Sequence, residues 1–134
     1  MIDQRIEGKE PFTADYIQEI ESVLGREVPS EYAAFVREKG GAFVGGYIDN
    51  NDNLPLDGFF GCSDESGVVN QLMVYDDLRE IQVLPIAFCV LGNMYVIEVD
   101  GTAHYINYYG GRTTVLKVSE TFGNFMERIV FREE

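Results

Sequence analysis

The sequence has few basic residues relative to its acidic ones. Its 134 residues include 10 Lys and Arg against 23 Asp and Glu, which gives a formal net charge of −13. Such a charge repels phosphate backbones and anionic membranes, and it attracts cationic proteins. We therefore expect neither a nucleic acid nor a membrane as partner. An acidic surface also keeps cytosolic proteins soluble, so the charge alone does not establish that a partner exists.

The chain is also poor in histidine and cysteine. One histidine and two distant cysteines are too few to build a typical structural zinc site. We expect Cys62 and Cys89 to be free thiols, as in a reducing cytosol, although the sequence alone leaves a disulfide between them open. His104 lies in an alternating run with no serine or cysteine nucleophile placed near it, so we expect a residue at the surface or core edge.

Several targeting and ligand-binding signals are missing. The first residues lack the apolar segment of a signal peptide, and no apolar run approaches the ~20 residues of a membrane helix, so we expect a cytoplasmic protein. Asp49, Asn51 and Asn53 begin like a calcium-binding loop, but Leu54 and Phe60 replace the required Gly and Glu. The glycine-rich segments fit neither a phosphate-binding loop nor a dinucleotide fingerprint. We expect no metal, no cofactor and no catalytic residues.

Apolar spacing predicts helices near both ends of the chain and strands between them. Thr13 can cap a first helix that Gly25 ends, and Pro29 suits the first turn of a second helix that ends at Gly40. Gly-containing turns at about ten-residue spacing indicate an antiparallel meander over residues 83–118. The predicted elements are helices over 13–24 and 29–39, strands over 42–48 and 58–61 around a polar loop 49–57, a helix over 63–81 capped by Ser63 or Asp64, the meander, and a closing helix over 119–131.

These elements predict one α+β domain over residues 1–134, because no linker, repeat or low-complexity segment divides the chain. We expect an antiparallel meander with the helices packed mainly on one side.

Acidic residues dominate the middle of the sequence. Between Gly40 and Leu78 there are seven acids, and from Glu80 to Gly111 there are three more, with no Lys or Arg in either stretch. A field of one sign speeds association with a cationic partner, and aromatic side chains within a charged rim are typical of protein interfaces. We expect Phe59 and Phe60, which lie among these acids in sequence, to belong to the core. The predicted partner-binding residues are Tyr47, Asp49, Asp52, Asp57, Asp64, Glu65, Asp76, Asp77 and Tyr108.

The segment "VPSEYAAFVREKGG" resembles the signature helix of the SUKH superfamily. Val28, Pro29, Tyr32, Phe35 and the following Gly pair carry this resemblance. Later segments agree in the expected order: "FFG" at 59–61, "LPIAFCVLGNMYVIEVDG" at 84–101 and "ETFGNFMERI" at 120–129. The sequence departs from the pattern at Cys89-Val90-Leu91, where the family often has a more polar approach to the turn, and at Gly123 inside the last helix.

The resemblance implies a non-enzymatic binding protein with a SUKH-like fold. The superfamily includes fungal cell-wall assembly regulators and bacterial immunity proteins, which are thought to neutralise toxins, many of them nucleases, by direct binding in the cytoplasm. For this chain it implies a cognate toxin, expected to be basic, bound by a monomer or a weak homodimer. The alternatives are a regulatory scaffold in cell-wall or stress signalling, and a small hydrolase or ligand-binding protein with a pocket at His104 or Cys62.

Overall fold

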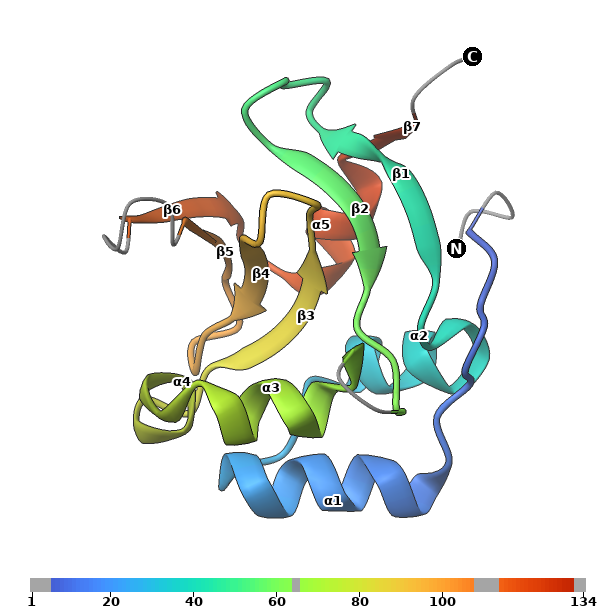
Figure 1. Cartoon of the computed structure of the whole chain (residues 1–134), viewed down its shortest axis with the longest axis vertical. Helices are drawn as coiled ribbons and strands as arrows, with labels where there is room; N and C mark the ends of the chain where they lie inside the picture. The colour runs from blue at the N-terminus through green and yellow to red at the C-terminus, as the bar shows by residue number, and fades with distance from the viewer. Residues whose placement is uncertain (1–5, 64–65, 108–113, 132–134) are drawn as a thin grey trace.

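The computed structural model of the chain describes residues 6–63, 66–107 and 114–131. Within these ranges it contains five helices and seven strands (Figure 1). The helices are α1 (Ala14–Leu24), α2 (Ser30–Lys39), α3 (Val68–Val74), α4 (Asp76–Glu80) and α5 (Phe122–Glu127). The strands are β1 (Phe43–Ile48), β2 (Pro55–Phe59), β3 (Leu84–Phe88), β4 (Met94–Ile97), β5 (Ala103–Asn107), β6 (Thr114–Ser119) and β7 (Ile129–Phe131).

All seven strands belong to one antiparallel sheet, in the order β6-β5-β4-β3-β2-β1-β7. Strands β3 to β6 follow one another along the chain, which confirms the predicted meander. Strands β6 and β7 lie at opposite edges, and α5 joins them. Helix α5 therefore crosses one face of the sheet, and the sheet curls around it (Figure 1). The fold is α+β, as predicted.

The two N-terminal helices begin and end where their capping residues predict. The hydroxyl of Thr13 accepts a hydrogen bond from the backbone N–H of Tyr16 at 3.1 Å, and α1 ends at Gly25. Helix α2 follows Pro29 and ends at Gly40. Among the described segments, no helix has the length and apolar character that a membrane span requires.

Three element boundaries differ from the sequence prediction. In place of one helix over 63–81 there are two short ones, Val68–Val74 and Asp76–Glu80, because the non-helical backbone of Tyr75 (φ −105°, ψ 88°) separates them. Gly67, and not Ser63 or Asp64, stands at the N-cap of α3. Residues 55–57 belong to β2 and not to the preceding loop. The closing helix ends at Glu127, and Ile129 starts β7, which pairs with β1. Residues 129–131 form a strand because they pair with β1. Periodicity in so short a segment cannot distinguish a helix from a strand.

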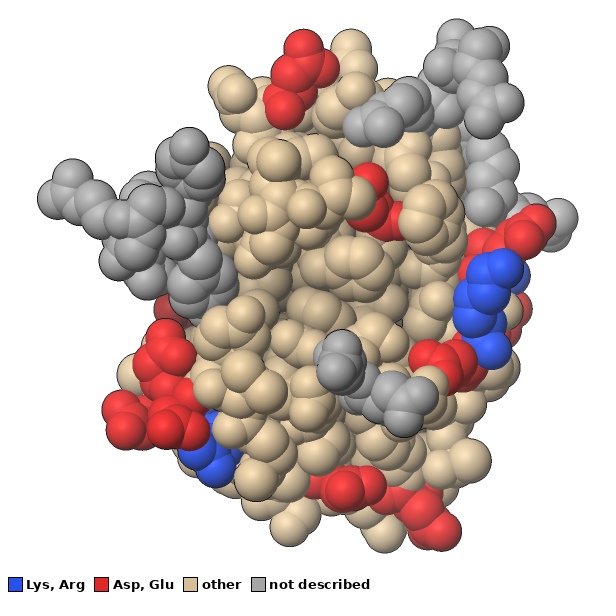
Figure 2. Space-filling view, in the orientation of Figure 1, with Lys and Arg blue, Asp and Glu red and all other residues tan. Residues whose placement is uncertain are grey.

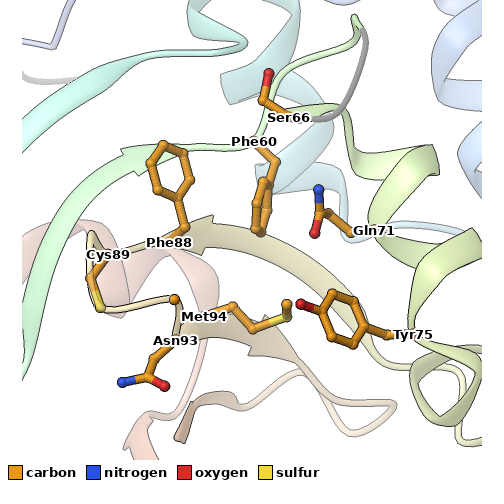
Figure 3. A pocket seen from close by; sticks show the side chains of 9 residues that line it. Phe60, Ser66, Gln71, Tyr75, Phe88, Cys89, Asn93 and Met94 are labelled. Carbon is orange, nitrogen blue, oxygen red and sulfur yellow. The ribbon is translucent and has the colours of Figure 1, made fainter. Parts of the chain in front are cut away.

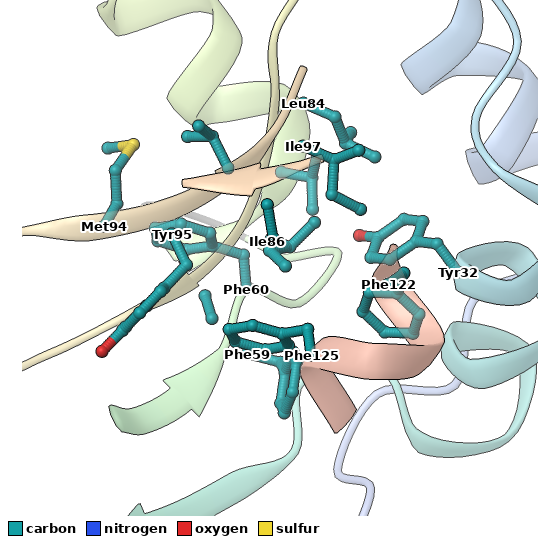
Figure 4. Close-up of a cluster of buried hydrophobic side chains, with 14 of the residues drawn as sticks. Tyr32, Phe59, Phe60, Leu84, Ile86, Met94, Tyr95, Ile97, Phe122 and Phe125 are labelled. Atoms are coloured by element: carbon teal, nitrogen blue, oxygen red, sulfur yellow. The ribbon is translucent and has the colours of Figure 1, made fainter. Parts of the chain in front are cut away.

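An aromatic cluster fills the space between α2, α5 and the sheet (Figure 4). The ring of Phe125 lies 5.4 Å from that of Tyr95 and 6.4 Å from that of Phe59, measured between centroids. Phe122 meets Tyr32 of α2 edge-on at 5.5 Å. Aromatic pairs in this range contribute about 0.5–1.5 kcal/mol beyond the area that they bury. Both Phe59 and Phe60 are buried, as the sequence predicts.

Candidate functional site

A groove of about 320 Å³ lies where the ends of β2, β3 and β4 meet α3 (Figure 3). Its walls are largely apolar, because Phe60, Phe88 and Met94 converge there from the three strands. Tyr75 closes it from the junction of α3 and α4, and the rings of Phe60 and Phe88 lie 5.2 Å apart. Tyr75 stands at the break in the helical backbone between α3 and α4.

The turn between β3 and β4 forms one rim of this groove and exposes two aliphatic side chains. Cys89, Gly92 and Asn93 of this turn line the groove, whereas Val90 is 82% exposed and Leu91 68% exposed. The N–H of Gly92 donates to the carbonyl of Cys89 at 3.1 Å, which closes a four-residue turn with Val90 and Leu91 at its tip. Gly92 has φ 86°, a conformation that glycine adopts without strain.

A buried carboxylate holds this turn from below. Asp57 of β2 is 7% exposed, and its Oδ2 accepts a hydrogen bond from the backbone N–H of Val90 at 2.6 Å. Hydrogen bonds with one charged partner contribute about 1.5–3 kcal/mol. The turn is therefore tied to a neighbouring strand that it does not follow in sequence, and the backbone that carries its two aliphatic side chains is held in place.

Further polar contacts support the base of the same turn. The Nδ2 of Asn93 donates to the hydroxyl of Tyr105 at 3.0 Å, and the Cys89 Sγ lies 3.5 Å from that hydroxyl. Burial is the largest effect on Tyr105, and together with Cys89 it raises the pKa of this phenol to about 12. The phenol therefore remains neutral at physiological pH and can accept and donate hydrogen bonds. Contacts to β2 and β5 thus fix the turn on both sides.

The structure corrects the prediction for Asp57, which was expected on the partner-binding surface. It is buried because β2 begins at Pro55, two residues before it, so this residue lies within the sheet and not in an exposed loop. Its carboxylate instead positions the β3–β4 turn. Asp64, Glu65 and Tyr108 lie outside the described residues.

The remaining predicted residues separate into two groups. Tyr47 is half-buried at the end of β1, and Asp49 and Asp52 follow in the β1–β2 hairpin, where the Asp49 carboxylate lies 3.5 Å from the guanidinium of Arg128. Asp76 and Asp77 are exposed on α4, on the opposite side of the molecule in Figure 1. The described acids therefore do not form one continuous patch. Figure 2 shows a face with uncharged side chains at its centre and acidic side chains mainly around its edge.

The other residues that the sequence singled out lie away from the groove. His104 is half-buried on β5, and its Nδ1 lies 3.0 Å from the Glu98 carboxylate. Both cysteines are free, as expected. Burial and the nearby Glu10 raise the pKa of the Cys62 thiol, which disfavours the reactive thiolate. Among the described residues, no group of three or more His, Cys, Asp or Glu side chains is placed to hold a metal ion.

Sequence reasoning did not assign Val90, Leu91 and Phe88 to a site. The sequence did contain a signal for the exposed turn. Two aliphatic residues directly before a Gly-Asn turn are unusual, and the same two residues depart from the SUKH pattern. The groove itself had no such signal, because its walls come from three strands and a helix junction.

The curled antiparallel sheet wrapped around a C-terminal helix defines a class of small α+β domains. Within this class, residues 11–128 match the model of the SMI1 / KNR4 family (SUKH-1), and the chain belongs to that family. The match spans most of the chain and agrees with the resemblance carried by its ordered motifs. No curated protein matches the chain in a sequence comparison.

Proposed function

We propose that this protein is a non-catalytic binding module that acts in immunity, and that it neutralises a basic toxin by binding it directly. The observation that carries the proposal is the β3–β4 turn, whose backbone is held by Asp57 and which exposes Val90 and Leu91 beside an apolar groove. A backbone that is already ordered favours association because it loses less conformational entropy on binding. Membership in the SMI1 / KNR4 family supports the proposal, since the superfamily includes bacterial immunity proteins.

The charge of the chain supports a basic partner. A net charge of −13 attracts a cationic surface over distances of about a Debye length, ~10 Å at moderate salt. A nuclease that binds its substrate through a positive groove presents such a surface. Charged rims mainly accelerate association, whereas apolar anchors slow dissociation.

The test uses the product of the gene next to the one that encodes this chain. We expect a stable complex whose association rate falls as salt is raised. Replacing the exposed Asp52 and Asp77 by Lys is expected to slow association about ten-fold or more at low salt. Glu127→Lys serves as the control. It changes the charge by the same amount as each of these replacements, but it lies on α5, the helix on the other side of the sheet. Absence of a complex, or rates unaffected by salt and by charge reversal, would count against the proposal.

The alternative is a regulatory scaffold in cell-wall or stress signalling, which would use the same surface for a different partner. Inhibition separates the two: an immunity protein abolishes the activity of its partner at one equivalent, whereas a scaffold leaves that activity in place.

A further inference from the structure

The groove and the β3–β4 turn together form an apolar surface that the fold of the chain leaves uncovered. Val90 and Leu91 are among the most exposed large apolar side chains of the described residues. They follow closely after Phe88 in sequence, and this groove-lining residue is itself only partly buried. Contiguous exposed apolar patches on protein surfaces often mark interaction sites.

The part of the sequence that builds this groove is rich in acids and poor in bases. The residues that line the groove lie between positions 60 and 94, within a stretch from Gly40 to Gly111 that contains ten acids and a single Lys or Arg. That base is Arg79, and its guanidinium is already paired with Asp76. Asp76 directly follows the groove residue Tyr75 in sequence. The complement of an apolar groove in acidic surroundings is an apolar side chain flanked by cations.

The volume of the groove limits what can enter. At about 320 Å³ it is at the lower end of the range of roughly 300–1,000 Å³ found for ligand pockets, and it suits one large side chain better than a bulky cofactor. Its aromatic and thioether walls favour a flat apolar group, since rings stack on Phe and methionine sulfur packs against ring edges.

We infer that the groove takes one aromatic or large aliphatic side chain from a partner segment in which Lys or Arg residues stand next to that side chain. Val90 and Leu91 contact the same segment from the rim of the groove, and Asp57 acts as a positioning residue because it fixes the turn. The inference rests on the proposed function for the identity of the partner, but it concerns only the chemistry of the segment that binds.

The experiment selects short random peptides displayed on phage against the folded chain. We expect the enriched peptides to carry Trp, Phe or Leu beside Lys or Arg. Because the chain contains no tryptophan, the emission of a Trp in an enriched peptide reports burial of that side chain alone. We expect a saturable blue shift. Exchanging the Lys or Arg residues of the peptide for Glu is expected to abolish it.

Variants of the chain then locate the binding site. Leu91→Ser is expected to weaken peptide binding about ten-fold or more, as for a central contact in an interface. Val99→Ser is the matched control, because Val99 is 62% exposed but lies beyond the other end of β4. Phe88→Ala tests the groove wall, with circular dichroism to confirm that this variant folds. Asp57→Asn is expected to weaken binding while leaving the Trp emission of the bound state unchanged.

The outcomes separate the inference from the proposed function. Enriched peptides that bind Leu91→Ser and Phe88→Ala as tightly as the wild type would overturn the inference, as would enrichment of acidic peptides or of none. Self-association that Leu91→Ser abolishes would show that a second copy covers the surface, and would also overturn it. A toxin complex unaffected by these variants would refute the inference and leave the proposed function standing. Peptides that bind through the groove, together with a chain that binds no toxin, would support the inference and refute the proposed function.

Discussion

The phenol of Tyr32 offers the sharpest test of the packing argument, because its hydroxyl is buried and meets no hydrogen-bond partner in the described part of the chain. The side chain is 1% exposed, and the hydroxyl has no hydrogen-bond partner among the described residues. Burial raises the pKa of this phenol far above its usual value. Its ring packs against Phe122 at 5.5 Å. Replacing Tyr32 by Phe keeps this ring contact and removes only the unpaired polar group.

The expected magnitude follows from two opposing effects. A buried unsatisfied hydroxyl costs about 1–3 kcal/mol, and removing it recovers that cost. The space left by one oxygen is on the order of 10–15 Å³, which at ~24 cal/mol per Å³ of cavity costs about 0.3 kcal/mol. Tyr32→Phe is therefore expected to raise the free energy of unfolding by about 1–2 kcal/mol.

Urea denaturation followed by circular dichroism measures this change. With a slope of about 2 kcal/mol per M, the midpoint is expected to rise by roughly 0.5–1 M while the slope stays constant. The melting temperature is expected to rise by about 3–8 °C.

Tyr95→Phe provides the matched control, since it makes the same chemical change at a satisfied hydroxyl. The Tyr95 hydroxyl donates to the carbonyl of Pro55 at 2.8 Å. Its removal leaves that carbonyl unpaired, so we expect a loss of about 1 kcal/mol or more. If Tyr32→Phe were destabilising to the same degree as Tyr95→Phe, the reasoning would be refuted, because the Tyr32 hydroxyl would then have a partner such as an enclosed water.

Three further predictions concern the close backbone contact at Gly46, the hydrogen bonds of Arg26 to two carbonyls, and the titration of Tyr105. Gly46→Ala is expected to lower the free energy of unfolding by about 1–3 kcal/mol, because a Cβ there would lie 2.2 Å from the Val130 carbonyl oxygen. Amide hydrogen exchange in β7 measures this change, and an unchanged exchange rate would contradict the prediction. Arg26 donates to the carbonyls of Gln82 and Ile97 at 2.8 and 3.0 Å, so Arg26→Lys is expected to cost about 1–3 kcal/mol in urea denaturation. The raised pKa of Tyr105 favours the folded state below pH 10, and this stabilisation is expected to be lost between pH 10 and about 12. Tyr105→Phe should reduce that alkaline slope, and an unchanged slope would contradict the assignment.

The sequence predicted the helices and the meander because these depend on neighbouring residues. Thr13 and Gly25 bound α1 through contacts within a few positions, and the Gly-containing turns of the meander act at similarly short range. The ordered motifs of the SUKH superfamily rest on the same local features, and the family match over residues 11–128 agrees with them.

The candidate site depended on contacts between distant residues. Asp57 looked like an exposed loop acid, but it is buried and binds the N–H of Val90, a residue 33 positions further along the chain. Likewise, β7 forms because β1 offers it an unpaired edge. The sequence by itself determined the composition, the charge and the local elements. Only the tertiary structure decided which acids are buried and which aliphatic side chains face solvent, because burial depends on what folding brings together from distant parts of the chain.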